Sequence, residues 1–383
     1  SCLTLILSLI ISSQSWGQTL DKVSIQLNWF HQFQFAGYYA AKEQGFYKEL
    51  GLEVELREFR GKEAIEDYVI DGRAQYGISD SSLIVAKSKG KPVVIVTQIF
   101  QHSPATLATL RSSGISTPFE LLGKRILADS VSENNAPIIA MLKQAGIDIS
   151  EYTWLKENYQ LSTLKNGGTD AVLIYSTDEP FKFNEENIDI FIIDPRDYGI
   201  DFYGDNLFTS ETEVKNNPQR VQAIRQATIK GWKYALSHQT EMIELIAKKY
   251  NSQNKSIEHL TFEASEISKI VLAKFIPIGS ITQTRMEKIT ETYHQLGMVD
   301  SPFLPENILL DQALESFAPK VIAADNSTSL IITMVAISLM LIAITLFLPK
   351  LITPKRMAIF MASRKFSLIV HSISLLNIAI IFS

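Results

Sequence analysis

The sequence predicts an α/β fold made of two lobes, and its 383 residues are enough for two domains with proper hydrophobic cores. Residues 18–325 alternate short runs rich in β-branched residues with helical patterns, as α/β domains do. The alternation runs through two similar series, and the second starts near Gly114. From Pro218 onward the pattern is mainly helical. Two such series with a helical return predict two lobes joined through the middle of the chain.

In the first series, apolar and β-branched runs predict four strands, at residues 22–27, 52–59, 74–79 and 92–100. The segments between the strands predict three helices, at residues 36–50, 61–72 and 81–90. Two of these helices end at a glycine, Gly51 and Gly90, which is the usual residue at a helix C-terminus.

The second series begins with a helical turn and a strand in "STPFELLGKRILA" and continues with a helix in "NNAPIIAMLKQAG". Further strands are predicted at residues 171–175 and 188–195. The helical return consists of "PQRVQAIRQATIKGWKYALSH", "EMIELIAKKY" and "SIEHLTFEASEISKIVL".

Residues 1–17 form a short apolar run that ends in Ser15, Trp16 and Gly17, the small-x-small pattern that a signal peptidase cuts. We therefore expect a partial export signal, and a buried strand or helix is the alternative. Cys2 lies inside this segment, so the mature chain would contain no cysteine. That excludes disulfides, thiol catalysis and thiolate metal ligands from the mature protein.

Residues 330–348, "LIITMVAISLMLIAITLFL", contain no charge and are long enough to cross a bilayer as a transmembrane helix. A buried helix of a soluble domain is the alternative. The basic residues that follow predict that residues 349–383 are cytoplasmic and residues 18–325 are periplasmic or outside. The chain would thus sit in the inner (cytoplasmic) membrane. Residues 366–382 are either a second span or the start of something truncated.

The charge and the motifs of the sequence exclude several classes of function. A net charge of -5, a pI near 5.8 and the lack of a lysine-arginine stripe argue against nucleic acid as a partner. The sequence contains no nucleophile elbow, P-loop, zinc-protease motif or paired cysteines. His31 and His102 have no partner at metal-ligand spacing in the sequence. We therefore expect no catalytic residue, no metal and no cofactor.

Ligands of open α/β sheets bind beyond the carboxyl ends of the strands. The segments that follow the predicted strands are residues 28–38, 79–82, 100–104, 129–135 and 175–180. They contain amides, hydroxyls, aromatic rings and carboxylates, which suit stacking on a planar heterocycle and binding of its amines. The residues in question are Asn28, Trp29, Ser79, Asp80, Asn134, Tyr175 and Glu179. Trp29 could instead belong to a core, and Asp80 and Glu179 could cap helices.

Six segments, in this order and spacing, resemble the thiamine pyrimidine synthase-like family. They are "LNWFHQFQFAGYYAAKEQGFYKELGLEVEL", "QYGISDSSLIVAKSKGKPVVIVTQIFQHSP", "LLGKRI", "YSTDEPF", "YGIDFYGDNLFTSE" and "GWKYALSH". The family comprises periplasmic binding proteins for pyrimidine precursors of thiamine and, in fungi, the synthase itself. The resemblance covers roughly residues 20–300 and implies a type II periplasmic-binding fold. One lobe would contain residues 18–110 and 206–320, and the other residues 111–205.

The resemblance to the synthase fails at the positions that carry its chemistry. That enzyme builds the pyrimidine from its own histidine and a pyridoxal phosphate held on a lysine, and it has a cysteine-rich iron-binding run. Here Ser79 stands at the lysine position and Leu83 at the histidine position, and Phe35 replaces a further histidine. The "DFYGDNLFTSE" segment has no cysteine. Catalysis is therefore not supported.

Carried over position by position, the resemblance implies that Asn28 and Trp29 line the ligand site, with Phe35 in place of a polar residue. Six further positions are implied to complete it, in both lobes: Ser79 with Asp80, Tyr175 with Glu179, and Tyr203 with Asp205. We expect a membrane-anchored, periplasm-facing protein that binds a small heterocycle, as the sensory part of a signalling receptor. Its partners would be that ligand, the membrane, and a cytoplasmic signalling domain or an ABC permease. The alternatives are a substrate-binding protein of an ABC importer and the synthase itself.

Overall fold

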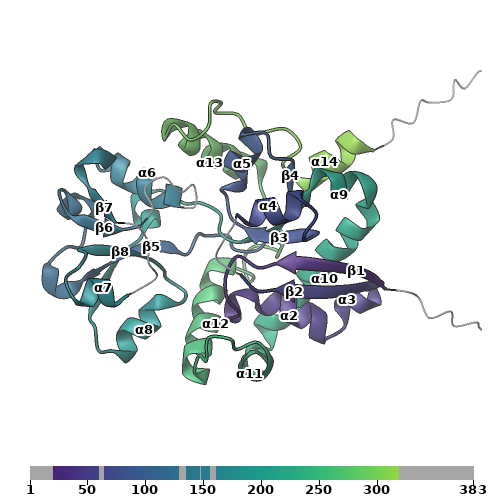
Figure 1. The fold of residues 1–383 in the computed structure, drawn as a ribbon, viewed down its shortest axis with the longest axis horizontal. Helices are drawn as coiled ribbons and strands as arrows, with labels where there is room; N and C mark the ends of the chain where they lie inside the picture. Colours follow the sequence, from purple (N-terminus) through teal and green to yellow (C-terminus); the bar gives the residue numbers. More distant parts are fainter. Residues whose placement is uncertain (1–19, 60–63, 129–134, 147, 156–160, 319–383) are drawn as a thin grey trace, which may run out of the picture. The chain divides into compact units, whose positions relative to one another are not determined.

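The computed structural model describes residues 20–59, 64–128, 135–146, 148–155 and 161–318, which belong to one compact unit that ends at Ala318 (Figure 1). The unit contains two five-stranded sheets, one in each lobe. Short 3-10 helices connect several of the strands and helices: η1 (Phe33–Phe35), η2 (Arg111–Ser113), η3 (Pro118–Leu121), η5 (Ile149–Glu151) and η6 (Pro195–Tyr198).

The sheet of the first lobe has the strand order β2-β1-β3-β10-β4. Its strands are β1 (Asp21–Gln26), β2 (Leu52–Arg57), β3 (Tyr76–Ser79), β4 (Val93–Gln98) and β10 (Asn206–Ser210). β1 is parallel to β2 and β3, whereas β10 is antiparallel to both β3 and β4. The carboxyl ends of β1, β3 and β4 therefore share one edge with the beginning of β10.

Helices surround this sheet, and two hydrophobic cores form with them. One core includes residues of α2 (Ala36–Glu43), α3 (Phe46–Glu49), α9 (Glu211–Asn216), α10 (Pro218–Ser237), α11 (Gln239–Lys249), α12 (Ile257–Val271) and α14 (Leu310–Phe317). The other core includes residues of α4 (Ile65–Ile70), α5 (Leu83–Ser88) and α13 (Gln283–Gln295). The helix predicted at residues 36–50 is divided into α2 and α3, because Gly45 adopts a left-handed backbone with φ 77°.

The sheet of the second lobe has the order β7-β6-β8-β5-β9. Its strands are β5 (Ala105–Leu110), β6 (Arg125–Leu127), β7 (Thr153–Leu155), β8 (Ala171–Tyr175) and β9 (Ile190–Ile193). Its helices are α6 (Ala136–Gln144), α7 (Ser162–Lys165) and α8 (Glu179–Glu185). β6 is parallel to β7 and β8, and β5 runs antiparallel between β8 and β9.

The chain crosses between the lobes from β4 to β5, which Figure 1 labels, and crosses back from β9 to β10. The predicted boundary at residue 110 falls too late, because β5 already pairs with β8 and β9 of the second sheet. The sequence analysis also missed β5 and β10 as strands. Each of these strands is the first one after the chain has crossed into the other lobe.

Within the part of the chain that the structure describes, no helix is both long and apolar enough to cross a membrane. Three predicted segments lie outside the described residues: the signal at residues 1–17, the span at residues 330–348 and the second run at residues 366–382.

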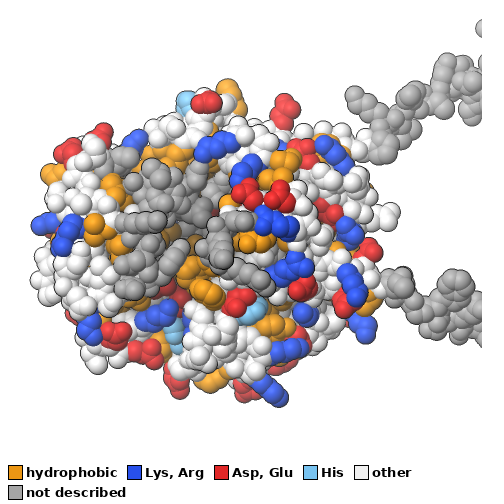
Figure 2. All heavy atoms as spheres, viewed as in Figure 1, with side chains coloured by type: hydrophobic (Ala, Val, Ile, Leu, Met, Phe, Trp, Pro, Cys, Tyr) orange, Lys and Arg blue, Asp and Glu red, His pale blue; other side chains and the backbone are white. Residues whose placement is uncertain are grey.

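Acidic and basic side chains are interspersed on the face drawn in Figure 2.

The contact between α2 and α10 depends on two glycines. A Cβ atom at Gly231 would lie 2.2 Å from the carbonyl oxygen of Gly37, and one at Gly37 would lie 2.1 Å from the ring of Trp232. Both distances are far inside van der Waals contact, and in the first case the obstacle is backbone. Only glycine at these positions allows the two helices to approach so closely.

Replacing Gly231 with alanine should therefore lower the free energy of unfolding by about 3 kcal/mol, at the upper end of the usual effect of overpacking. Urea denaturation of the full chain would measure this. The control is Lys233→Ala, an exposed position on the same helix, which should change stability by no more than about 0.5 kcal/mol. Equal effects of the two substitutions would contradict this account of the helix contact.

Candidate ligand-binding site

Three polar side chains, those of Asn28, Gln34 and Asp205, meet at the carboxyl edge of the first sheet. Asp205, directly before β10, accepts a hydrogen bond at Oδ2 from Gln34 Nε2 at 2.6 Å. Its Oδ1 accepts a longer bond from Asn28 Nδ2 at 3.4 Å. Asn28 follows β1 after a single residue. The structure thus brings together Asn28 and Asp205, both predicted from the sequence, and adds Gln34, which the prediction missed.

The backbone around Asp205 is fixed by the neighbouring strand. The Asp205 carbonyl accepts bonds from the backbone N–H groups of Ile99 and Phe100, at 3.1 and 3.0 Å. Gln98 Nε2 also donates to the carbonyls of Gly204 and Asp205, each at 3.0 Å. Because these bonds reach carbonyl groups, the sheet fixes the backbone of Asp205, while the carboxylate is held by the side chains of Gln34 and Asn28.

Ser79 and Asp80 lie at the adjacent end of β3. Asp80 Oδ1 accepts a bond from the Ser82 N–H at 2.8 Å, so this carboxylate caps the turn that leads into α5. The Asp80 carbonyl accepts a bond from Asn206 Nδ2 at 3.1 Å, which ties the turn to β10. Ser79 Oγ donates to Glu66 of α4 at 3.0 Å. The end of β3 is therefore linked to the Asp205 segment.

Burial raises the pKa of two carboxyl groups at this edge, those of Asp205 and Asp80. Loss of water and, to a smaller extent, the nearby Asp80 carboxylate raise the pKa of Asp205, and the hydrogen bonds from Gln34 and Asn28 lower it. The net result is a pKa of about 7. Burial likewise raises the pKa of Asp80 to about 6, with a smaller contribution from Glu66. Near neutral pH, each group can accept a hydrogen bond when ionised or donate one when protonated. Two such carboxyl groups can bind a small ligand that carries N–H donors and ring nitrogens.

Trp29 lies in an aromatic group beside this edge. Its ring stacks on Phe59 with centroids 5.6 Å apart and an interplanar angle of 21°, and it meets the edge of Phe30 at 5.4 Å. Trp29 is half-buried, and 39% of Phe30 is exposed. Trp29 also packs against the first core, so one part of it is structural while another part remains accessible.

Two other predicted ligand residues are buried in the protein. Phe35 has no exposed surface and belongs to the first core. Tyr203 is 2% exposed, the Arg285 guanidinium lies 4.1 Å from its ring centroid, and its hydroxyl accepts a bond from the Thr282 N–H. Phe35 thus packs with the core, and Tyr203 contacts Arg285 and Thr282 of the same lobe.

On the second lobe, Glu179 begins α8 and accepts a bond at Oε2 from the backbone N–H of Tyr175 at 2.8 Å. Burial and, to a smaller extent, the adjacent Asp178 carboxylate raise the pKa of Glu179 to about 7. Tyr175 and Glu179 thus form a local pair at the end of β8, as expected of residues that follow a strand. Asn134 lies outside the described residues.

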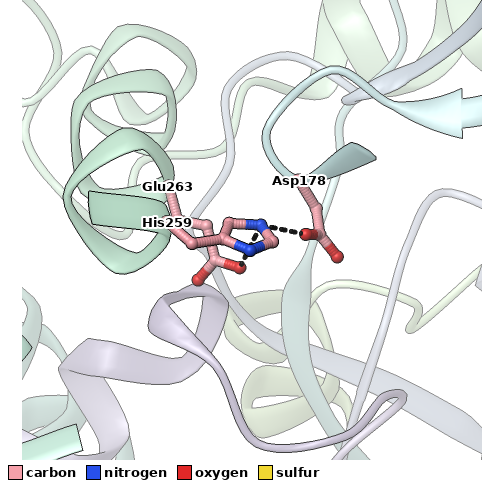
Figure 3. Close-up of side chains that lie close together, drawn as sticks. All are labelled: Asp178, His259 and Glu263. Carbon is pink, nitrogen blue, oxygen red and sulfur yellow. Dashed lines mark hydrogen bonds and ion pairs between the residues drawn. The ribbon is translucent and has the colours of Figure 1, made fainter. Parts of the chain in front are cut away.

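The sequence analysis did not foresee a buried ionic cluster between the lobes (Figure 3). Asp178 of the second lobe accepts bonds at Oδ1 from Lys255 Nζ at 2.8 Å and from His259 Nε2 at 2.7 Å. Lys255 also pairs with Glu263 of α12. The four side chains are at most 5% exposed. The spacing of His259 and Glu263, four residues apart on one helix face, was the only local signal for this cluster.

Asp178, His259 and Glu263 offer donor atoms within 4.8 Å of one another, a spacing that could hold a metal ion. The Lys255 ammonium is bonded to both carboxylates. Burial favours a neutral lysine, but these carboxylates outweigh it and raise the pKa of Lys255. Burial would also raise the pKa of Asp178, yet its bonds with His259 and Lys255 hold it well below its ordinary value. The set therefore fits an ammonium better than a metal ion.

The fold and the edge site define a class of protein: a two-lobed periplasmic-binding-protein fold. The periplasmic aliphatic sulphonate-binding protein SsuA of Escherichia coli is similar, with a TM-score of 0.60, 15% identity, and coverage of 75% of this chain and 91% of that one. The alkanesulfonate-binding protein SsuA of Xanthomonas axonopodis pv. citri, bound to MOPS, gives a TM-score of 0.59 at 13% identity, covering 75% and 97%. At these identities the likeness shows the fold alone.

The chain belongs to the NMT1/THI5-like family, whose model matches residues 32–242. It is 23% identical over 241 residues to the formylaminopyrimidine-binding protein of Halalkalibacterium halodurans, covering 62% of this chain and 73% of the relative. It is 21% identical over 232 residues to the riboflavin-binding protein RibY of Chloroflexus aurantiacus, covering 59% and 66%. It is also 22% identical over 300 residues to the 4-amino-5-hydroxymethyl-2-methylpyrimidine phosphate synthase of Aspergillus parasiticus, covering 74% and 85%.

The raised pKa of Asp205 predicts how the site affects stability. The folded protein holds the Asp205 proton more tightly than the unfolded chain, whose aspartates titrate near about 3.9. The wild type should therefore lose stability relative to Asp205→Asn as the pH rises from about 4 to about 7, by up to about 1.4 kcal/mol per pH unit. Urea denaturation of both proteins across this range would measure the difference.

The matched control is Asp300→Asn, an exposed aspartate outside the site, for which the difference from wild type should not vary with pH in this way. A flat difference for Asp205→Asn, or one that rises with pH, would show that the Asp205 proton is not held by folding.

Proposed function

We propose that the chain is an extracytoplasmic binding protein for a small nitrogen heterocycle. The observation that carries this proposal is the bonding of Asn28 and Gln34 to the buried Asp205 carboxylate at the carboxyl edge of the first sheet. The half-buried Trp29 ring beside it can stack on a planar ligand. Relatives named for binding formylaminopyrimidine and riboflavin, both nitrogen heterocycles, support this ligand class.

A role as a pyrimidine phosphate synthase is less well supported, although relatives carry that name. The two positions that the resemblance assigns to catalytic lysine and histidine hold Ser79 and Leu83. Ser79 is 7% exposed and bonds to Glu66, and Leu83 has no exposed surface and packs in the second core. Neither side chain can form a Schiff base or donate ring atoms.

We further propose that the binding domain is anchored in the inner membrane by residues 330–348 and is the sensory part of a signalling receptor. The uncharged run and the basic residues after it support an anchor with its far side in the cytoplasm. Ligand binding would favour one arrangement of the two lobes and transmit that preference through the span. A substrate-binding role for an ABC importer is the second candidate, favoured by a fold neighbour titled the ligand-binding component of an ABC-type import system.

Ligand binding can be tested by thermal shift of the full chain with 4-amino-5-hydroxymethyl-2-methylpyrimidine and riboflavin as probes. At least one probe should raise the melting temperature. Trp29→Ala should weaken its affinity at least about tenfold, because the lost stacking and burial are worth about 1.4 kcal/mol or more.

The matched control is Trp154→Ala, which removes another half-buried tryptophan, on the edge strand β7 of the second sheet. It should lower stability without changing the affinity for the probe. If no heterocycle raises the melting temperature of the wild type, the proposed ligand class is wrong. If Trp29→Ala still binds normally, Trp29 is a core residue only.

Membrane anchoring predicts that the full chain sediments with membranes and resists extraction by alkaline carbonate. Deleting residues 330–348 should release the protein into the soluble fraction, because the run that would span the bilayer is then missing. Sedimentation followed by immunoblotting would measure both. A full chain found in the soluble fraction would contradict the anchor and favour the importer role.

A further inference from the structure

The Lys255 ammonium is saturated by acceptors from both lobes. Its three N–H groups have three partners: Gln32 Oε1 at 2.7 Å, Asp178 Oδ1 at 2.8 Å, and Glu263 Oε1. Asp178 comes from the second lobe, while the other two belong to the first. A buried charge that loses its partner is strongly unfavourable. If Asp178 moves away from Lys255, the ammonium loses a partner, and water that enters the cluster would have to replace it.

The Asp178 side of the cluster has a second attachment to the first lobe. His259 Nε2 lies 2.7 Å from Asp178 Oδ1, and the His259 ring stacks on Phe181 of α8 with centroids 4.5 Å apart. The start of α8 is thus held to α12 by one hydrogen bond and one aromatic contact, and Figure 3 shows the bond between Asp178 and His259.

Two glutamines connect this cluster to the ligand site. Gln32 accepts from Lys255 through Oε1 and donates through Nε2 to Gln34 Oε1 at 2.6 Å. Gln34 then donates through Nε2 to Asp205 Oδ2, also at 2.6 Å. All three of Gln32, Gln34 and Asp205 are at most 3% exposed. An amide oxygen accepts hydrogen bonds and an amide nitrogen donates them. The bond that each glutamine accepts at its oxygen therefore determines which way its nitrogen points.

Glu263 fixes the same segment from a second direction. Its Oε2 accepts the backbone N–H of Phe33 at 2.8 Å, while its Oε1 pairs with Lys255. Phe33 is the residue between the two glutamines and begins η1. The ion cluster therefore holds both the backbone and the side chains of the segment that reaches Asp205.

We propose that Asp178 and Lys255 form a latch between the lobes, which positions the Asp205 carboxylate through Gln32 and Gln34 when it is closed. The latch rests on the contacts between the lobes alone, whereas the effect on ligand binding rests on the proposed function. Opening of the lobes would withdraw Asp178 and leave Lys255 with one carboxylate. It would also loosen the hydrogen bonds that run from Lys255 through Gln32 and Gln34 to Asp205, which we call the relay. Closure of the lobes and preparation of the ligand site would then be one event.

The lobe arrangement can be measured on the full chain by electron paramagnetic resonance between two spin labels. Cys2 is the only cysteine, so Cys2→Ser provides a background for labels at Lys48→Cys and Asn166→Cys, both exposed and in different lobes. Without ligand, Asp178→Asn should shift the distance distribution toward longer separations. Gln32→Met should leave it unchanged, because that substitution interrupts the relay but not the contact between Asp178 and Lys255.

The position of Asp205 can be followed by carboxyl NMR, with no ligand present. In Gln32→Met the Gln34 amide loses the partner that orients it, and its bond to Asp205 favours the ionised form, so the pKa of Asp205 should rise. Asp178→Asn should raise it as well. Both variants should bind 4-amino-5-hydroxymethyl-2-methylpyrimidine at least about tenfold more weakly than wild type, since fewer molecules are competent to bind.

The matched control is Lys87→Met, which breaks a largely buried ion pair with Glu211 within the first lobe. It should change neither the distance distribution nor the pKa of Asp205. If Asp178→Asn does not fold, His259→Leu removes one contact of Asp178 and should give a smaller shift in the same direction.

An unchanged distance distribution in Asp178→Asn, or an equal change in Lys87→Met, would overturn the latch. A pKa of Asp205 that is unaffected by Gln32→Met would overturn the relay. If the probe does not bind the wild type, the proposed ligand is wrong, while the distances and the pKa still decide on the latch and the relay.

Discussion

The pairing of β10 between β3 and β4 is the contact on which the site depends. Because β10 is antiparallel to both neighbours, its first residues lie at the edge where the parallel strands end. Asp205 directly precedes β10 and so arrives beside Asn28 and Gln34, which are 177 and 171 positions away along the chain. The return of the chain from the second lobe therefore completes the candidate site of the first.

The chemistry of this edge differs from what the fold alone would suggest. The similar structures include proteins named for binding sulfonates and nitrate, which are anions. Here buried carboxyl groups, Asp80 and Asp205, have pKa values raised toward neutrality. An edge of this kind suits a ligand with hydrogen-bond donors better than an anion. A shared fold does not fix the ligand, because the residues at the strand ends differ from one protein to another.

The contact between the lobes is ionic where it involves Asp178, Lys255, His259 and Glu263. Buried ion pairs add little net stability, since the loss of water offsets most of their attraction, but they are specific in geometry. Such a contact can define one arrangement of the lobes without making it permanent. It suits domains that must separate and rejoin better than a large hydrophobic interface does.

The sequence by itself determined the two α/β series, most of the strands and helices, and the strand ends where Asn28, Trp29, Ser79 and Asp80 lie. Those features depend on local periodicity, which a single chain displays. The sequence did not reveal β5, because "ATLATL" repeats every three residues and lacks the two-residue alternation of a strand. It did not reveal β10 either, because "NLFTS" has its two apolar residues side by side and shows no such alternation.

The tertiary structure decided which side chains meet. Phe35 and Tyr203 are buried, although the family resemblance implied ligand contacts at both positions. The bond between Lys255 and Asp178 joins residues 77 positions apart in different lobes, and no local pattern predicts it. Periodicity records which face of an element is apolar, whereas the partner of a buried charge is fixed only when distant segments pack against each other.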